Sequence, residues 1–130
     1  MRNMNKEDYC AQRLRVLIAE NSPGTRQNLS ELCASLPHLE VVGEAGNGLD
    51  AIEAVRILKP DVLTLDMNMP RISGFDVLRM MLHEKRRCVV IVLTSLADEF
   101  YRKKCRELKA THFFNKITEF EQFLELMKSM

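Results

Sequence analysis

The sequence has almost no net charge, no long apolar run and no closely spaced pair of cysteines, and each absence argues against a class of protein. Its 19 Lys and Arg residues against 18 Asp and Glu leave a formal charge of +1, which argues against a nucleic-acid binder that works by bulk electrostatic attraction. No apolar run approaches the ~20 residues that span a bilayer, so no membrane partner is expected. A length of 130 residues suits one compact domain, because two smaller units would each be marginally stable.

The four cysteines, Cys10, Cys33, Cys88 and Cys105, include no CxxC pair and have no nearby histidine at metal-ligand spacing. A zinc site is therefore not expected. Cys33 and Cys88 lie within apolar patterns, where a free cysteine behaves as a small buried hydrophobic residue. This placement favours a reducing compartment, the cytoplasm.

The first thirteen residues are polar and charged and contain no apolar segment. A secretory signal needs such a segment, so residues 1–13 are predicted to be a disordered or loosely packed N-terminal extension. Residues 14–130 then form the folded domain.

Five short apolar runs with many β-branched residues predict five strands. Segments with the periodicity of a helix separate these runs, so strand and helix alternate five times. Three of the runs are nearly continuously apolar, as strands are when helices cover both faces of a parallel sheet. The predicted fold class is therefore α/β, a doubly wound parallel sheet with helices on either side. The expected strands are Leu14 to Ala19, Leu39 to Val42, Val62 to Leu65, Cys88 to Leu93 and Thr111 to Phe114.

The expected helices carry start and stop signals. Ser22 followed by Pro23 predicts an N-cap and a first helical position, and Pro60 closes the second helix. A fourth helix of low apolar content is expected over Ala97 to Leu108. The segment Thr118 to Glu121 has the spacing of a capping box and predicts the start of the last helix.

Polar side chains follow the apolar runs at the ends of four predicted strands. Because the carboxyl ends of parallel strands share one edge of the sheet, where α/β folds bind ligands, these side chains are expected to converge. Carboxylate and amide oxygens suit a hard cation such as Mg²⁺, and hydroxyl and ammonium groups neutralise phosphate oxygens. An aspartate placed there can act as a nucleophile and form an aspartyl-phosphate. The residues are Glu20 and Asn21, Asp66, Thr94 and Ser95, and Lys116.

One segment is more specific than the strand pattern. In Leu63 to Gly74, Asp66 stands four residues before Pro70 and eight before Gly74. With this segment, the chain from about Leu14 onward resembles the receiver domain of two-component response regulators. The resemblance implies a flavodoxin-like (βα)5 fold with a five-stranded sheet in the order 2-1-3-4-5. Further support comes, in chain order, from Val41 to Gly48 (VVGEAGNG), Val92 to Ser95 (VLTS) and Phe113 to Lys116 (FFNK).

The resemblance implies a signalling role and no enzymatic activity on other molecules. Asp66 would accept a phosphoryl group from a sensor histidine kinase or a phosphotransfer protein in a step that needs Mg²⁺. The added charge of about −1.5 to −2 would change how a downstream protein target binds the face made by Ala97 to Leu108, the strand after it and the last helix. No direct binding of nucleic acid is expected. The resemblance implies that Glu20, Asp66, the backbone carbonyl of Asn68 and, in place of an acid, Asn21 hold the metal ion. Thr94 and Lys116 would contact the phosphoryl oxygens. Thr94 and Phe113 would act as the switch residues.

Two positions depart from the family pattern. The family usually has an acidic residue where this chain has Asn21, so the site loses one of about three negative charges and weaker Mg²⁺ binding is expected. The family typically has a proline, usually in the cis form, where this chain has Ile117. A cis bond before Ile117 would cost about 2.5–4 kcal/mol, so the loop after Lys116 is expected to take another path.

Other interpretations stay open at this point. The two departures also suit a pseudo-receiver, a module that binds proteins independently of phosphorylation. A phosphatase with an aspartyl nucleophile is poorly supported, because such enzymes tend to have a second aspartate where this chain has Asn68. The basic stretch from Arg102 to Lys109 is either a solvated face or a contact for an acidic partner. Since the chain ends at Met130, soon after the last apolar residue, a stand-alone receiver without an effector domain is expected.

Overall fold

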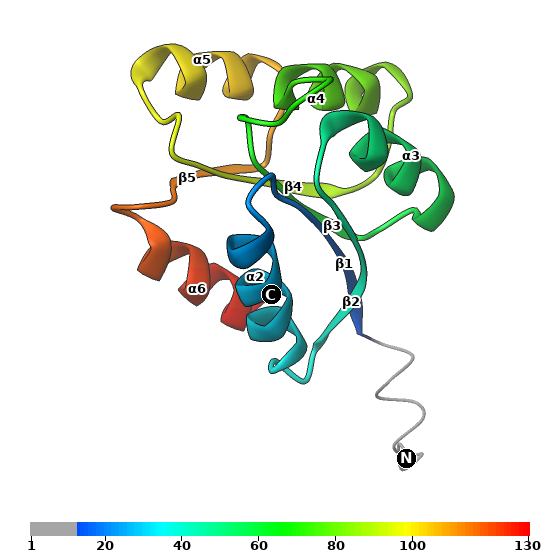
Figure 1. Ribbon diagram of the computed structural model, residues 1–130, viewed down its shortest axis with the longest axis vertical. Helices are drawn as coiled ribbons and strands as arrows, with labels where there is room; N and C mark the ends of the chain where they lie inside the picture. The colour runs from blue at the N-terminus through cyan, green and yellow to red at the C-terminus, as the bar shows by residue number, and fades with distance from the viewer. Residues whose placement is uncertain (1–12) are drawn as a thin grey trace, which may run out of the picture.

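The computed structural model describes residues 13–130, so all but the last residue of the predicted extension lies outside the described residues. Strands and helices alternate along this part of the chain (Figure 1). The strands are β1 (Leu14–Ala19), β2 (Leu39–Ala45), β3 (Val62–Leu65), β4 (Val89–Thr94) and β5 (His112–Asn115). The helices are α2 (Pro23–Ala34), α3 (Gly48–Leu58), α4 (Gly74–His83), α5 (Glu99–Glu107) and α6 (Phe120–Ser129).

The five strands form one parallel sheet in the order β2-β1-β3-β4-β5, which confirms the predicted fold class and strand order. The order reverses at β1, because β2 lies on one side of this strand and β3 on the other. Ala19, the last residue of β1, pairs with Ala45 of β2 and with Leu65 of β3. The carboxyl ends of these three strands are therefore level, and the residues that follow them meet at one edge.

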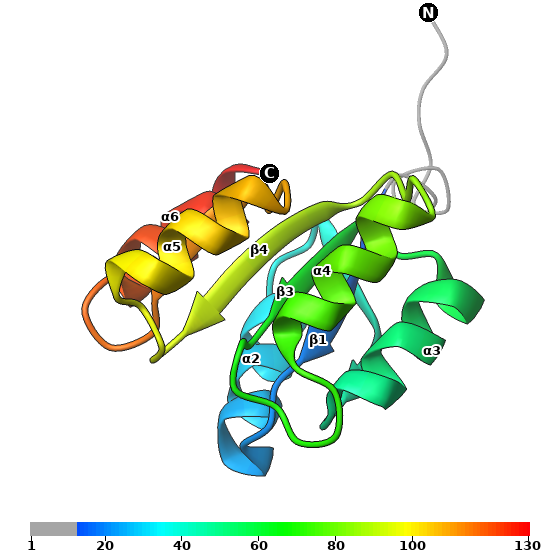
Figure 2. The same cartoon turned by 90° about the horizontal axis from the view of Figure 1, so that it is seen from above.

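Helices α3, α4 and α5 cover one face of the sheet, and α2 and α6 cover the other (Figures 1 and 2). Alternate strand residues enter the two cores: Leu17 packs with the first layer and Ile18 with the second. Both side chains are fully buried, and such burial contributes roughly 1.5–3 kcal/mol for each large apolar side chain. The two cores hold the sheet as a rigid platform for the residues at its carboxyl edge.

The predicted start of the first helix and the predicted end of the second are confirmed. Ser22 caps α2 with Pro23 in its first turn, and α3 ends before Pro60 with Lys59 in the left-handed region (φ 47°). The end of β2 was predicted too early, because the strand continues from Val42 through Ala45. Gly43 and Glu44 break the apolar pattern, but their backbones still pair with β1.

The predicted capping box at Thr118 is wrong. Helix α6 starts at Phe120, and no side-chain hydrogen bond caps it. The Glu119 carboxylate instead accepts a hydrogen bond from the backbone N–H of Asn115 (2.8 Å), and the side chain of Asn115 accepts one from the N–H of Ile117 (2.8 Å). These side chains therefore stabilise the turn that leaves β5, and are not available to the helix end.

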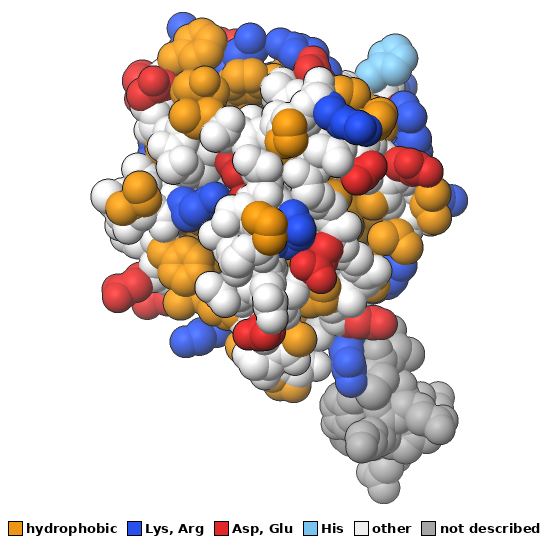
Figure 3. Space-filling view, in the orientation of Figure 1, with side chains coloured by type: hydrophobic (Ala, Val, Ile, Leu, Met, Phe, Trp, Pro, Cys, Tyr) orange, Lys and Arg blue, Asp and Glu red, His pale blue; other side chains and the backbone are white. Residues whose placement is uncertain are grey.

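No helix between residues 13 and 130 combines the length and the apolar content needed to cross a membrane. Acidic and basic side chains are interspersed on the face shown in Figure 3, in keeping with the small net charge. Cys33 is buried as predicted and, like Cys88 and Cys105, has a free thiol. Burial raises the pKa of the Cys33 thiol to about 11, so this thiol stays protonated at neutral pH.

Candidate functional site

Two buried carboxyl groups lie at the carboxyl edge of the sheet. Glu20 directly follows β1 and is 1% exposed, and Asp66 directly follows β3 and is 5% exposed. The backbone N–H of Asp66 donates to the carbonyl of Ala19 (3.0 Å), so the pairing of β1 with β3 continues up to the two acids. Buried carboxylates are costly unless other groups compensate their charge, and three neighbours provide this compensation.

Thr94 and Asn68 both donate hydrogen bonds to Oδ1 of Asp66. The Thr94 hydroxyl lies 2.9 Å from this oxygen, and the backbone N–H of Asn68 lies 3.1 Å from it. Thr94 is the last residue of β4 and is fully buried, and its hydroxyl also accepts a hydrogen bond from the backbone N–H of Leu96 (3.1 Å). The hydroxyl is thus held in one orientation, toward Asp66.

Lys116 supplies a positive charge to both acids. It directly follows β5, and its backbone N–H donates to the carbonyl of Thr94 (2.9 Å). Its Nζ forms an ion pair with Oε1 of Glu20 and lies 3.5 Å from Oδ2 of Asp66. The exposed Ile117 therefore does not keep the lysine out of the site, and no peptide bond between residues 13 and 130 is cis.

Two predicted residues lie at the rim of this cluster. Asn21 is exposed, and its backbone N–H donates to Oε2 of Glu20 (2.9 Å). Asn68 is also exposed, and its backbone N–H donates a hydrogen bond to Asp66. The site therefore contains two buried acids and an exposed amide on the residue after the first acid. Ser95, which follows Thr94, is exposed.

Phe113, the predicted switch residue, does not belong to the group of side chains that contact Asp66. It pairs with Val92 in the sheet and packs, half-buried, in the core under α3, α4 and α5. The guanidinium of Arg102 lies 4.8 Å from the centre of the Phe113 ring, donates to the carbonyl of Ala97 (3.2 Å) and pairs with the carboxylate of Glu119. Phe113 is therefore linked to Arg102 on α5 and, through it, to the start of α6.

The sequence pattern did not single out Arg102 or Glu119. Arg102 stands in a run of basic residues, and Glu119 stands in what resembles a capping box. Only contacts between residues distant in the chain distinguish them, and a single sequence carries no signal of such contacts.

The two acids titrate in opposite directions. Burial, followed by hydrogen bonding with Asp66, raises the pKa of Glu20 to about 7. Burial also acts to raise the pKa of Asp66, but hydrogen bonding with Glu20, the N–H of Asn68, the charge of Lys116 and the Thr94 hydroxyl together lower it. Asp66 is therefore ionised at neutral pH, while Glu20 is partly protonated.

The donor set fits a hard divalent cation in part. Burial is the main cause of the raised pKa of Glu20, and the nearby Asp66 adds to it; a bound cation would favour the ionised form of both acids. The groups in position to hold Mg²⁺ are the carboxylates of Glu20 and Asp66, with the amide of Asn21 and the backbone carbonyl of Asn68 next to them in the chain. Among residues 13–130, no three His, Cys, Asp or Glu side chains form a metal cluster, in agreement with an amide at position 21.

Comparison with known proteins agrees with this geometry. The family model described as response regulator receiver domain matches residues 16–128. The crystal structure of the response regulator domain of Thermotoga maritima CheB is similar at a TM-score of 0.80 and 32% identity, over 90% of this chain and 92% of that one. The CheX-CheY-BeF3-Mg²⁺ complex from Borrelia burgdorferi is similar in fold, with a TM-score of 0.79 at 24% identity over 89% of this chain and 87% of that one.

The curated relatives are longer proteins. A protein-glutamate methylesterase/protein-glutamine glutaminase of Pyrococcus abyssi is 42% identical over 87 residues, which are 67% of this chain and 23% of that protein. The transcriptional regulatory protein BtsR of Salmonella typhi is 39% identical over 106 residues, which are 82% of this chain and 44% of that protein. The chain thus spans less than half the length of these relatives, and what it shares with them is one module. Glu20, Asp66, Thr94 and Lys116 together form the acidic edge of the sheet. On the family match, the fold and the arrangement of this acidic edge, the chain belongs to the family of response regulator receiver domains.

Proposed function

We propose that this receiver domain accepts a phosphoryl group on Asp66 from a sensor histidine kinase or a phosphotransfer protein, in a step that depends on Mg²⁺. The observation that carries the proposal is a buried Asp66 carboxylate whose pKa is lowered, with a hydroxyl group and an ammonium group at its two oxygens. An ionised carboxylate is the form that attacks phosphorus.

In the transfer, a carboxylate oxygen of Asp66 forms the new P–O bond. The bond from phosphorus to the leaving group of the donor breaks, and its electron pair stays with the donor. The Thr94 hydroxyl and the Lys116 ammonium group, which now contact Asp66, would turn to the oxygens of the transferred phosphoryl group and offset their charge. Glu20, Asp66, the backbone carbonyl of Asn68 and Asn21 would hold Mg²⁺, which would supply further positive charge to offset that of the phosphoryl group.

The signal would leave the site through Thr94. The N–H of Leu96 is hydrogen-bonded to the Thr94 hydroxyl, and the carbonyl of the next residue, Ala97, accepts from Arg102. A hydroxyl that turns from Asp66 to a phosphoryl group therefore pulls on the β4–α5 loop and on the guanidinium that covers Phe113. The face made by α5, β5 and α6 would then change its affinity for a downstream protein target, with no nucleic acid bound directly. The free, buried thiols of Cys33 and Cys105 support a cytoplasmic location.

Asn21 favours a second candidate function, that of a pseudo-receiver which binds a protein partner without phosphorylation. An amide in place of a carboxylate weakens the attraction for Mg²⁺, and without the ion the transferred charge is less well compensated. The two candidates differ in whether Asp66 is ever modified.

Incubation with acetyl phosphate and a series of Mg²⁺ concentrations, followed by intact-mass measurement, separates the two functions. We expect the mass of one phosphoryl group to be added to the unchanged chain and to Asp76→Asn, in which an exposed aspartate of α4 is neutralised. Asp66→Asn should gain nothing. If the unchanged chain gains no phosphoryl group at any Mg²⁺ concentration, nor from sensor histidine kinases, the pseudo-receiver is the correct function.

A further inference from the structure

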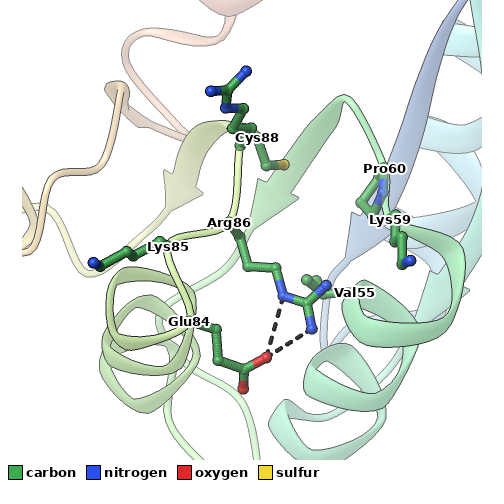
Figure 4. Close-up of a pocket in the computed structure, with 8 residues that line it drawn as sticks. Val55, Lys59, Pro60, Glu84, Lys85, Arg86 and Cys88 are labelled. Atoms are coloured by element: carbon green, nitrogen blue, oxygen red, sulfur yellow. Dashed lines mark hydrogen bonds and ion pairs between the residues drawn. The ribbon is translucent and has the colours of Figure 1, made fainter.

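A cavity of about 350 Å³ lies at the end of the sheet opposite to Asp66 (Figure 4). Its walls come from the ends of α3 and α4 and from Pro60 and Cys88, which precede β3 and β4, whereas Asp66 follows β3. This volume is within the range of small-molecule sites. The lining has one acid, Glu84, and four basic residues: Lys59, Lys85, Arg86 and Arg87.

Glu84 binds two guanidinium groups, and that of Arg86 lines the cavity. Arg86 donates to Oε1 of Glu84 from Nε (3.2 Å) and Nη2 (2.7 Å), and Arg56 donates to Oε2 from Nε (3.0 Å) and Nη2 (2.6 Å). Figure 4 shows the Arg86 side chain between Glu84 and Val55, near the middle of the lining residues. The two arginines lower the pKa of Glu84 to about 2, so the carboxylate stays ionised and its charge is more than offset. The trio carries a net charge of +1 in a fixed arrangement.

The three remaining cations at the rim have no ion-pair partner among residues 13–130. The side chains of Lys59, Lys85 and Arg87 are exposed, and none of them lies within ion-pair distance of a carboxylate. In Figure 4 the Lys85 side chain extends outward from the rim. Cations that repel one another around a hollow are stabilised when an anion enters it.

Capping of the helix ends does not account for these lysines. The carbonyls of Leu58 and Lys59 at the end of α3 already accept from Nη1 of Arg15 (2.6 and 3.1 Å). At the end of α4, the backbone N–H of Arg86 donates to the carbonyl of Met81 (3.0 Å). Lys59 and Lys85 also stand in the left-handed region (φ 47° and 52°), where a helix end ordinarily has glycine. The local backbone therefore favours another residue at both positions, and no side chain among residues 13–130 pairs with the two ammonium groups.

The cavity has no nucleophile that would indicate covalent chemistry. Burial, and to a smaller extent the charge of Asp61, raises the pKa of the Cys88 thiol to about 12. A thiol that stays protonated does not react as a thiolate, so Cys88 serves with Val55 and Pro60 as apolar lining.

We propose that this cavity binds a small compound with two or more linked phosphate groups, either inorganic pyrophosphate or the phosphate chain of a nucleotide. Glu84 binds Nε and Nη2 of Arg86 and so orients the guanidinium, and the N–H groups of Nη1 are left to donate to the oxygens of a phosphate. The exposed cations of the rim, Lys59, Lys85 and Arg87, then contact the other phosphate groups.

Calorimetric titration of the full chain with pyrophosphate, and separately with ATP, in metal-free buffer of low ionic strength tests the proposal. We expect one saturable site for pyrophosphate. The double variant Lys59→Gly/Lys85→Gly should bind about tenfold more weakly, because it removes two charges from the rim. Glycine suits both left-handed positions, so the melting temperature of this variant should not fall. Lys128→Ala removes an exposed charge from α6 and should bind as the unchanged chain does.

Asp66→Asn should retain the full affinity, which separates this cavity from the acidic edge of the sheet. Tighter binding of ATP than of pyrophosphate assigns the cavity to a nucleotide, and equal binding assigns it to the phosphates alone. The proposal is wrong if pyrophosphate shows no saturable binding or if the double variant binds it equally well. Binding of polyglutamate without binding of pyrophosphate would also overturn it, in favour of an acidic protein segment.

Discussion

The hydroxyl of Thr94 donates a 2.9 Å hydrogen bond to Oδ1 of Asp66 and accepts one from the backbone N–H of Leu96. One buried hydroxyl group thus joins the end of β4, the acid that follows β3 and the loop that leads to α5. Because no water reaches this group, each of its two hydrogen bonds has to be made within the protein.

Replacement of Thr94 by valine keeps the volume of the side chain but removes the hydroxyl. The Asp66 carboxylate and the Leu96 N–H then each lose a partner in a buried place, so we expect the free energy of unfolding to fall by about 2 kcal/mol. Thr94→Ser keeps the hydroxyl and should lose clearly less. Urea denaturation of the three proteins measures the difference, and equal losses in the two variants would contradict the role given to the hydroxyl.

The raised pKa of Glu20 predicts a stability that depends on pH. The folded chain holds the Glu20 proton up to about pH 7, and the unfolded chain releases it near 4.5, so stability decreases as pH rises through this window. The lowered pKa of Asp66 works in the opposite direction, but only as pH falls below its ordinary value of 3.8.

In buffer with EDTA, we expect the free energy of unfolding to fall by about 3 kcal/mol between pH 4.5 and 7.5, relative to the same change in Glu20→Gln. The comparison removes the contribution of all other titrating groups, which both proteins share. Parallel pH profiles would show that the Glu20 carboxyl titrates normally.

A carboxylate at position 21 should strengthen binding of Mg²⁺. Asn21→Asp adds a negative charge on the residue after Glu20, and we expect Mg²⁺ to bind about tenfold more tightly. Asn28→Asp adds the same charge to an exposed position of α2 and should change the affinity little. A calorimetric titration of the three proteins with Mg²⁺ measures these affinities. The same Mg²⁺ affinity in all three proteins would mean that the side chain at position 21 does not reach the ion.

The guanidinium of Arg102 should stabilise the face that contains Phe113. In Arg102→Ala the Phe113 ring loses a cation at 4.8 Å and Glu119 loses its ion pair, so we expect a loss of about 1 kcal/mol of stability. The pKa of Glu119, which the hydrogen bond from Arg102 lowers, should rise in this variant. Lys103→Ala, an exposed neighbour in the same helix, should change stability by less than about 0.5 kcal/mol. A loss of the same size in both variants would indicate an effect on the helix alone.

Gly74 allows the chain after Asp66 to pack closely. A Cβ at this position would lie 2.8 Å from Cα of Met67 and 2.9 Å from the carbonyl oxygen of Asp66, closer than backbone atoms tolerate. Gly74→Ala should therefore cost about 2 kcal/mol in urea denaturation and slow phosphorylation by acetyl phosphate. A Cβ at Gly24 would have no atom within 4 Å, so Gly24→Ala should be nearly neutral. Equal stability of the two variants would contradict this assignment.

The fold was predictable because its signals are local. The bounds of β1 and β3 agree with the sequence, since each is a continuous apolar run between turn residues. The end of β2 was not predictable, because Gly43 and Glu44 are held in the strand by pairing with β1 and not by their own propensity. Tertiary contacts override local preference at such positions.

The acidic edge was predictable from the rule that ligands bind at the carboxyl ends of parallel strands, and Glu20, Asp66, Thr94 and Lys116 come together as expected. The part played by Arg102 could not be found in this way, since one arginine among several basic neighbours has no local signature. The same holds for the basic cavity, whose cations come from two segments that only the order of the strands brings together.

The strands differ in how firmly they are held. Every residue of β3 is buried, whereas every residue of β5 is half-buried, and β5 pairs only with β4 at the edge of the sheet. Local unfolding starts where the least buried contact is lost, so the amide hydrogens of β5 should exchange with solvent sooner than those of β1 and β3. When β5 opens briefly, Phe113 within this strand and Lys116 directly after it leave their positions. Glu20 and Asp66 stay in place, because they follow β1 and β3, the strands that open last.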